Sequence, residues 1–555
     1  MPQERLLNMR YLYDNVVVLA VFFVLAAFAW LFGGTRSEYL VPVMPWLTAI
    51  LVEAMVCFPQ QHDGETSYEA RARVWSTLKK DPLVWTSLAL IVILLIPFMN
   101  VGLCQVCDYP AIAAGADPSP TIPFFPFCVD RVQHLNVVLW FVPSLVALVA
   151  TKHAMLKRGK RMLLALIVWN GLALGVIGAL QQVTHANGPL WLDEGIKGAY
   201  FFSTFGYPNM AGDYFTTLFG LSIGLWRWQL DDMRRKEAEM NVSISHSSSH
   251  SSAKSADGNA SVEKPDAPNG SGKEGETRLH HHHHSSQGAQ KTVPFWEKHY
   301  YLIPALVFFF CALDTLSRAA VMLVTGLAVI FFLHTFICLF SKMKKAQRVK
   351  AMVFSAVALT LISLCAVTFM PDDLHREVGT IDTTEVLDRV TGKGQYHVRV
   401  ATEIWKKHPL FGVGGWGYKH FCLQYMTDKE LRQIQIVGGM NVHNDYLQFL
   451  AEHGVVGLGL LVAIVLMTVL PLGRTWRDLI DLYRFTSPKE QPPQPIQIFV
   501  IPAPVFCILL TAVATLIHAF GDCPLRSPAV LSLFLVSLAT IDGYLPRLKK
   551  SSRHS

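Results

Sequence analysis

Apolar runs separated by short polar segments make up most of this chain. An α-helix of about 20 apolar residues crosses the hydrocarbon core of a bilayer, and runs of that length recur from end to end. The pattern predicts an all-α polytopic membrane protein with about twelve transmembrane helices. We place these helices near residues 15–34, 38–58, 83–105, 135–151, 162–184, 209–228, 299–315, 319–340, 351–370, 454–472, 498–520 and 528–544.

Composition agrees with this pattern. Of the 555 residues, 52% are apolar and 16% are charged, whereas an average soluble domain is about a quarter charged. A single soluble core is therefore excluded, and membrane lipids are the expected surroundings. The net charge of +7 predicts no nucleic-acid partner, because the placement of the basic residues along the chain explains it.

The basic residues concentrate in alternate connecting segments. If the N-terminus is cytoplasmic, the inner segments hold 34 of the 48 lysines and arginines. Each short inner loop is then basic and each short outer loop is nearly bare, which is the positive-inside pattern. We therefore expect both termini to be cytoplasmic. Arg5, Arg10 and residues 27–29 imitate a cleavable signal peptide, but the apolar run continues through Phe32 and predicts an uncleaved helix.

Six regions follow from this pattern. They are an N-terminal transmembrane region (1–208), a helix with the start of a cytoplasmic loop (209–236), a disordered cytoplasmic insertion (237–295), further transmembrane helices (296–370), a large outer loop (371–453), and C-terminal transmembrane helices with a cytoplasmic tail (454–555). The insertion is Ser/Gly/Lys/Glu-rich and cannot bury enough apolar surface to fold. In a second outer loop, 106–134, Cys107 and Cys128 are either bridged, as an oxidising compartment permits, or free thiols.

The large outer loop mixes charged, aromatic and apolar residues as an ordered segment does. Residues 396–408 predict a helix that Pro409 ends, and GVGGWGY at 412–418 predicts a glycine-rich turn. Residues 442–453 predict a second helix that stops at Gly454 and continues into the next span. We therefore expect any chemistry to lie in this loop.

His443 opens the second of these helices. The positive end of a helix disfavours the imidazolium, and a neutral histidine is what a general base requires. A capping or merely hydrogen-bonding surface histidine fits the spacing equally well. Asn444 is a good N-terminal residue, and Glu452 is either a supporting group or a solvated residue at the membrane edge. His518 and Asp522, one helical turn apart, predict either a pair that locks helix ends or supporting groups of the site.

Arginines at the outer face are candidates for binding phosphate. Arg318 lies between two strongly apolar segments at headgroup level, where a planar guanidinium suits phosphate oxygens. Arg389 and Arg399 lie with several lysines in the large loop. Such cations would stabilise a departing pyrophosphate, but a solvated loop face balanced by nearby carboxylates is equally consistent.

Five stretches together resemble the O-antigen ligase and polymerase superfamily of bacterial envelope glycosyltransferases. Ser203–Asn209 resembles the family's TFGxxN segment, and Ser317-Arg318 resembles its serine-arginine pair. Lys407–Gly414 resembles the hPlxGvG turn. The fourth stretch, His443–Leu447 with Glu452–Gly457, is similar to the family's HNxxL...ExGxxG element. The fifth, His518 with Asp522 and Pro524, is similar to its late H...DxP segment.

The resemblance implies transfer of a glycan from an undecaprenyl-pyrophosphate carrier at the periplasmic face of the bacterial inner membrane, without metal or nucleotide cofactor. His443 then looks like the base, and Arg318 like the arginine that holds pyrophosphate. The family's second Gly-Arg is not present before the turn, so Arg399 or Arg389 takes that place, with Asn209, Asn444, Glu452, His518 and Asp522 as supporting residues.

Three acceptors remain open within the family. As a ligase, the enzyme would join O-antigen to lipid A-core, and this is the alternative that we favour. As a polymerase it would join repeat units, and as a protein glycosyltransferase it would modify a protein hydroxyl. From another class, a transporter or lipid-linked oligosaccharide flippase also has about twelve spans, but such carriers show internal repeats and ionisable residues at mid-membrane. Neither is evident in this sequence.

Overall fold

The computed structural model describes residues 2–100, 122–192, 201–256, 294–341, 348–350, 353, 396–431, 441–486 and 501–545. Every regular element among them is helical, apart from one isolated β-bridge between Phe202 and Phe205. The predicted fold class, an all-α polytopic membrane protein, is confirmed. Two compact units are present, residues 1–225 with 301–555 and residues 226–300.

Seven helices of the described residues are long and apolar enough to cross a membrane. They are Tyr13–Trp30 in α1 (Pro2–Trp30), Pro82–Met99 in α5 (Pro82–Leu95) and η2 (Ile96–Met99), α7 (Arg131–His153), α8 (Lys157–Val183), Arg318–Cys338 in α12 (Arg318–Ser341), Asp445–Leu470 in α19 (Asp445–Thr486), and α20 (Ala503–Gly521). Shorter apolar helices are α3 (Met44–Cys57), α11 (Leu302–Asp314) and Pro528–Gly543, which comprises α21 (Pro528–Thr540) and η7 (Ile541–Gly543).

Each of these helices overlaps one of the predicted spans. The predicted span 209–228 lies at the start of α9 (Pro208–Ala256). The predicted span 351–370 lies outside the described residues, apart from residue 353. The total of about twelve spans therefore stays a prediction.

The helix α9 continues further than the composition indicates. Residues 237–256 are helical, although we predicted disorder from residue 237 onward. The first of these residues belong to the Arg/Lys/Glu/Ala/Met stretch at 234–240, and all five residue types are good helix formers. In the smaller unit, the indole Nε1 of Trp226 donates a hydrogen bond of 3.0 Å to His299 at the end of α10 (Phe295–His299).

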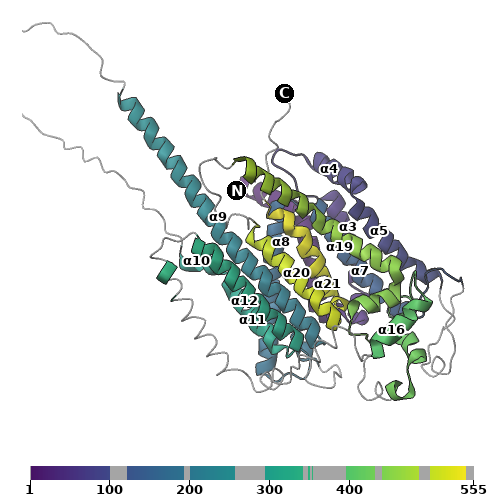
Figure 1. The fold of residues 1–555 in the computed structure, drawn as a ribbon. Helices are drawn as coiled ribbons and strands as arrows, with labels where there is room; N and C mark the ends of the chain where they lie inside the picture. The colour runs from purple at the N-terminus through teal and green to yellow at the C-terminus, as the bar shows by residue number, and fades with distance from the viewer. Residues whose placement is uncertain are drawn as a thin grey trace, which may run out of the picture. The chain divides into compact units, whose positions relative to one another are not determined.

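In the larger unit, α21 forms the centre of the helix packing. All of its residues are buried, and it packs against α7, α20 and α1 (Figure 1). Glycines of α8 allow α9 and α11 to approach closely, because small residues bring helix backbones together. A Cβ atom on Gly171 would lie 2.3 Å from Leu218, and one on Gly175 would lie 3.0 Å from Cys311.

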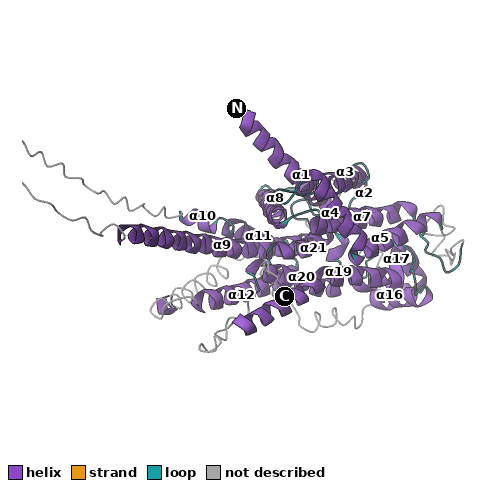
Figure 2. Cartoon of the chain, turned by 90° about the horizontal axis from the view of Figure 1, so that it is seen from above, coloured by secondary structure: helices purple, strands orange, loops and turns teal. Residues whose placement is uncertain are grey.

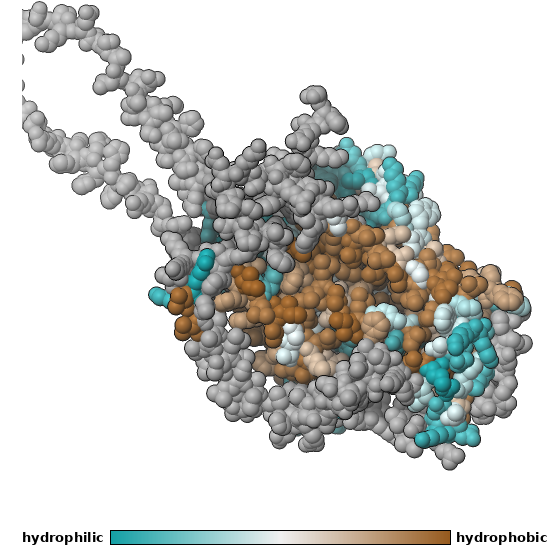
Figure 3. Space-filling model, in the orientation of Figure 1, coloured by the Kyte–Doolittle hydropathy of each residue, from teal (hydrophilic) through white to brown (hydrophobic). Residues whose placement is uncertain are grey.

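Segments predicted to share one side of the membrane contact one another. Lys152 lies 3.2 Å from Asp81, and Lys160 lies 2.6 Å from Asp542. Figure 3 shows hydrophobic side chains covering the face over α19 and α20, while hydrophilic side chains gather at α4 (Ser67–Lys80) and at α16 (Tyr396–Lys407). Among the described residues, the predicted inner segment at α4 and the predicted outer segment at α16 therefore lie at opposite ends of an apolar band, as a membrane-spanning unit requires.

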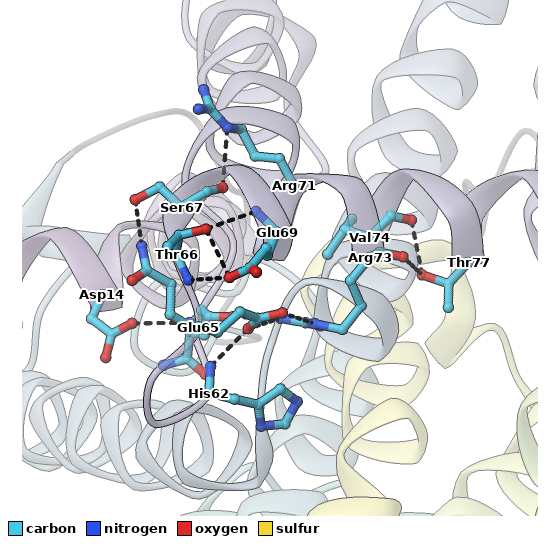
Figure 4. Close-up of polar contacts among 12 residues, drawn as sticks. Asp14, His62, Glu65, Thr66, Ser67, Glu69, Arg71, Arg73, Val74 and Thr77 are labelled. Carbon is cyan, nitrogen blue, oxygen red and sulfur yellow. Dashed lines mark hydrogen bonds and ion pairs between the residues drawn. The ribbon is translucent and has the colours of Figure 1, made fainter.

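The α3–α5 connection is fixed by the capping of α4. Thr66 accepts a hydrogen bond from the backbone N–H of Glu69, whose carboxylate accepts one from the Thr66 N–H in return (Figure 4). This capping box satisfies two N–H groups that a helix start leaves free. Arg73 binds Glu65 at 2.8 Å and the carbonyl of Gln60 at 2.7 Å, so the preceding turn is held as well.

The large outer loop has its own hydrophobic core beside α19. Helix α16 occupies Tyr396–Lys407, as predicted, and is followed by α17 (Gly417–Phe421) and η4 (Cys422–Tyr425). Figure 1 and Figure 2 both show α16 beside α19. The buried residues of this core are Phe127, Val129, Val400, Ala401, Ile404, Val413, Tyr418, Phe421, Cys422, Met426, Val442 and Ala451. Cys128 lies next to it and places its thiol 3.3 Å from the carbonyl of Pro97, while Cys107 lies outside the described residues.

Candidate active site

A break in α19 joins the outer loop to the membrane helix. At Gly454 the backbone adopts φ 64° and ψ −173°, a region open essentially to glycine. The glycine turn fills the break: Val413 and Gly414 donate N–H groups to the carbonyls of Ala451 and Glu452 at 3.1 and 2.8 Å. In the other direction, the N–H of Val455 donates to Pro409 and that of Val456 to Leu410, at 2.9 and 3.1 Å. The two motifs therefore form one structural unit.

His443 lies just before the helical residues of α19. It has φ +54°, a left-handed conformation that is uncommon for residues other than glycine. The next residue, Asn444, caps the helix, because its side-chain oxygen accepts from the N–H of Leu447 at 3.0 Å. Asn444 also donates to the carbonyl of Phe520 at 3.1 Å. These contacts hold His443 on the end of α20 with 45% of its side chain exposed.

Asp522, immediately after α20, is the partner of His443. The Nδ1 atom of His443 lies 3.2 Å from Oδ1 of Asp522. Burial raises the pKa of this carboxyl, but the hydrogen bond from His443 and the nearby charges of His518 and His443 outweigh it and lower the pKa to about 2. An ionised carboxylate only accepts hydrogen bonds, so Nδ1 of His443 carries the proton. In the neutral form of the ring, the lone pair is therefore on Nε2.

Two residues from the TFGYPN stretch complete the environment of Asp522. The Tyr207 hydroxyl donates to this carboxylate at 3.1 Å, and the Asn209 amide donates to it as well. The Asn209 amide also donates to the Tyr207 oxygen at 3.0 Å. The carboxylate is thus oriented from both sides, which fixes the ring of His443.

His518 does not pair with Asp522 but with Asp213 of α9. Its Nδ1 lies 3.0 Å from Asp213, which also accepts from Thr515 at 2.8 Å. The predicted helix-end pair of His518 and Asp522 is therefore replaced by two separate carboxylate–histidine pairs. The reason is that α20 ends at Gly521, and the extended backbone of Asp522 turns its side chain away from the helix.

Glu452 is buried rather than solvated. It accepts from Gln448 at 3.2 Å and from Arg526 Nη1 at 3.1 Å. The guanidinium carbon of Arg526 also lies 4.1 Å from the ring centre of Trp416, a cation–π geometry. Glu452 therefore ties the helix break to the loop after α20.

A second imidazole faces His443. The ring of His397, on α16, lies 6.2 Å from the ring of His443 in an edge-to-face arrangement. Its Nδ1 is 2.9 Å from the hydroxyl of the buried Tyr418. Burial, followed by the neighbouring His443, lowers the pKa of His397 to about 4, so this ring is neutral at pH 7.

The three predicted arginines are placed differently. Arg318 begins α12, and the turn before it contacts α9: a Cβ atom on Gly212 would lie 3.4 Å from the Cβ of Ser317. Because Gly212 is one helical turn from Asn209, Arg318 lies at the same end of the unit as His443. Arg399 binds Glu430 at 2.8 Å and the carbonyl of Tyr425 at 3.1 Å. Arg389 lies outside the described residues.

The centre of the site also contains possible metal ligands. The donor atoms of His443, Asp522 and Cys523 lie within 4.8 Å of one another, and these are ligand types that zinc accepts. In the structure they are joined by hydrogen bonds, since the Cys523 thiol lies 3.3 Å from the same oxygen of Asp522 that His443 contacts. Burial raises the pKa of Cys523 well above its ordinary value, which keeps the thiol protonated.

Sequence reasoning missed several members of this arrangement. Tyr207 and His397 were part of stretches that we quoted, but nothing marked them as neighbours of His443. Asp213 is a charged residue inside the predicted span 209–228, and Arg526 is a charged residue between the last two predicted spans. A charged side chain in or beside a membrane span has a high free-energy cost unless it has a partner. That cost indicates that both residues need a partner, but it does not say which one.

Comparison with known proteins agrees with the motifs. Residues 303–462 match the family model described as O-antigen ligase. The match includes α11, α12, α16, the glycine turn and His443, and it confirms the predicted resemblance to that superfamily. It supports a membrane glycosyltransferase of the ligase and polymerase type. No curated protein matches the chain.

Proposed function

We propose that this chain, whose residues 303–462 match the O-antigen ligase family, transfers a glycan from undecaprenyl-pyrophosphate to an acceptor hydroxyl at the periplasmic face of a bacterial inner membrane. The observation that carries the proposal is the pair of His443 and Asp522 at the end of the apolar band, 3.2 Å apart, with the histidine half exposed. The residue roles below belong to this proposal.

His443 is the general base. Its Nε2 takes the proton of the acceptor hydroxyl while the acceptor oxygen bonds to the anomeric carbon of the donor sugar. The bond from that carbon to the pyrophosphate oxygen breaks, and its electron pair leaves with the pyrophosphate. Asp522 holds the ring in the tautomer that this step requires and stabilises the imidazolium that forms, as carboxylates do for catalytic histidines.

Arg318 meets the charge that develops on the leaving group. A guanidinium offers a planar fork to two phosphate oxygens, and such preorganised cations stabilise a transition state electrostatically. Arg399 and Arg389 are the proposed second cations. To bind phosphate, Arg399 must exchange the carboxylate of Glu430 for it. We give Arg318 the principal role because the Ser317-Arg318 pair is one of the stretches that carry the family resemblance.

The acceptor that we favour is lipid A-core, which makes the enzyme an O-antigen ligase. Polymerisation of repeat units and glycosylation of a protein hydroxyl use the same chemistry at His443. Glycolipid analysis of a deletion strain separates them. Loss of capped lipid A-core with intact polymer indicates a ligase, single-repeat caps indicate a polymerase, and unchanged lipopolysaccharide with an unglycosylated protein indicates the third.

The catalytic proposal is tested by His443→Ala in the full-length, membrane-inserted protein. Transfer should fall by about 10²- to 10⁴-fold, the usual contribution of a positioned base, while binding of the lipid-linked donor stays unchanged. Arg318→Ala should instead weaken donor binding. Wild-type transfer by a well-inserted His443→Ala protein would refute the role of His443 as the base. Unaltered donor binding by the Arg318→Ala protein would refute the role of Arg318 in binding pyrophosphate.

A further inference from the structure

An apolar cavity of about 310 Å³ lies between α7, α19, α21 and the loop after α20. Along α19 it runs from Asp445 past the helix break to Leu466, so it extends from the outer end into the apolar band. Its walls are aromatic and aliphatic side chains, among them Phe449, Leu461 and Leu535. Of the residues named above for the site, Glu452 lines this cavity, whereas His443, Asp522 and Arg318 do not.

One end of the cavity is rich in hydrogen-bond donors. Arg526 and Trp140 both line it, and both side chains are more than nine-tenths buried. Two guanidinium nitrogens of Arg526, Nε and Nη2, and the indole Nε1 of Trp140 have no partner among the described residues. The guanidinium carbon lies 5.9 Å from the ring centre of Trp140, so these donors are close together.

The neighbouring acceptors are already engaged. Glu452 accepts from Arg526 Nη1 and from Gln448. Asp445 accepts from the backbone N–H of Leu525 at 2.8 Å. None of these bonds reaches Nε or Nη2 of Arg526 or Nε1 of Trp140, and a buried donor without an acceptor is unfavourable. A group with several acceptor oxygens and negative charge satisfies them, and a phosphate suits the arginine fork.

The shape of the cavity limits the molecule that fits. A phosphate at one end of an apolar slot describes an anionic lipid. A volume near 310 Å³ is at the small end of the range for ligand pockets, about 300–1,000 Å³. It accommodates part of one hydrocarbon chain rather than the several chains of a glycerophospholipid or of lipid A.

We propose that this cavity binds the lipid-linked donor, with the phosphate nearest the lipid at Arg526 and the first part of the polyprenyl chain along α19. The proposal rests on the proposed function for the identity of the lipid. It is consistent with the path of the chain, because Arg526 follows Asp522 in the same short loop and Asp445 lies two residues after His443. A donor held there has its sugar end next to the imidazole.

The test uses photolabelling of the full-length protein in lipid nanodiscs. The probe is a polyprenyl phosphate that carries a diazirine in the first part of its hydrocarbon chain, and labelled peptides are identified by mass spectrometry. We expect labels on Phe449, Leu461 or Leu535 and competition by unlabelled polyprenyl phosphate but not by phosphatidylglycerol. Labels confined to other segments, or equal competition by the two-chain lipid, would overturn the proposal.

Variants make the test specific. Leu461→Trp fills the cavity, and its matched control is Leu460→Trp, at the neighbouring position that does not line the cavity. Arg526→Gln removes the charge, and Trp140→Phe removes one donor while keeping a ring, so the result does not depend on one folded variant. Arg526→Gln should lower labelling at least about tenfold, the loss of one charge-assisted contact. Leu461→Trp should lower labelling because the indole occupies the space of the lipid chain. Equal labelling of the Leu461→Trp and Leu460→Trp proteins would refute the site.

Photolabelling does not require glycan transfer, so the lipid-site proposal and the catalytic proposal can be refuted independently of each other. The His443→Ala protein should be labelled like the wild type. If that variant also transfers glycan normally, the base is wrong while the lipid site stands. If Leu461→Trp is labelled like the wild type while His443→Ala is inactive, the lipid site is wrong and the catalytic proposal stands.

Discussion

The Asp522→Asn variant tests the centre of the proposed mechanism. The substitution keeps the size of the side chain but removes its charge, so the ring of His443 loses an ionic acceptor at 3.2 Å. An amide can also present its NH₂ group to Nδ1, which favours the wrong tautomer of the ring. Asp522 is a positioning residue in this proposal, because it acts on the substrate only through His443.

The expected size of the effect follows from that single contact. A hydrogen bond to a charged group contributes about 1.5–3 kcal/mol, which corresponds to about 10- to 150-fold in rate. The loss should appear in kcat, with little change in KM, because the contact strengthens when the imidazolium forms. The double variant with His443→Ala should be no slower than His443→Ala alone, since two residues that act through one group are not additive.

The assay is transfer of a lipid-linked glycan to acceptor in proteoliposomes, normalised to folded protein. The control is Asp213→Asn, which removes the same kind of carboxylate from His518 and leaves the His443 pair in place. We expect this control to retain kcat within a few-fold while it loses thermal stability. A kcat for Asp522→Asn no lower than for Asp213→Asn, or a loss expressed entirely in KM, would refute the positioning role.

Three further predictions follow from the site. Gly454→Ala should lower stability by about 1–3 kcal/mol from backbone strain alone, and more because its Cβ would lie 2.2 Å from the carbonyl of Leu410. Thermal unfolding compared with Gly459→Ala, whose Cβ would contact nothing within 4 Å, measures this loss. Equal unfolding temperatures would contradict it. Dialysis against EDTA should leave transfer unchanged and Cys523→Ser should stay active, whereas loss of activity that Zn²⁺ restores would assign His443, Asp522 and Cys523 to a metal centre. Folding lowers the pKa of Asp522 from about 3.9 to about 2. The ionised carboxylate therefore stabilises the fold by on the order of 2 kcal/mol, fully above about pH 4 and less as the pH falls towards 2. In acid unfolding followed by near-ultraviolet circular dichroism, Asp522→Asn should lack this loss of stability between pH 4 and 2.

Local signals predicted the elements of the site correctly. The helix expected at 396–408 is α16, and the helix expected at 442–453 stops at Gly454 before continuing as a membrane span. Both depend on neighbouring residues: apolar periodicity, a proline, a capping asparagine and a glycine. The His443 and Asp522 candidates came from separate motifs, and the structure brings them into contact.

The pairings between distant segments could not be predicted in the same way. We interpreted His518 and Asp522 as a possible pair because they are one turn apart, but each binds a residue on another helix. We interpreted Glu452 as either a supporting group or a solvated residue at the membrane edge, and the structure pairs it with Arg526, 74 residues later. Sequence spacing records which residues share a helix face, whereas helix packing decides which faces meet.

The docking of the glycine turn into the break at Gly454 has a consequence for protein engineering. Each segment donates backbone hydrogen bonds to the other and accepts them from it. The two segments, about 40 residues apart in the chain, therefore have to match in conformation. A chimaera that takes its outer loop from one relative and its following membrane helix from another should fold only when both halves of this joint come from the same parent. Exchange of this loop between relatives therefore has to be attempted with residues 396–460 as one cassette.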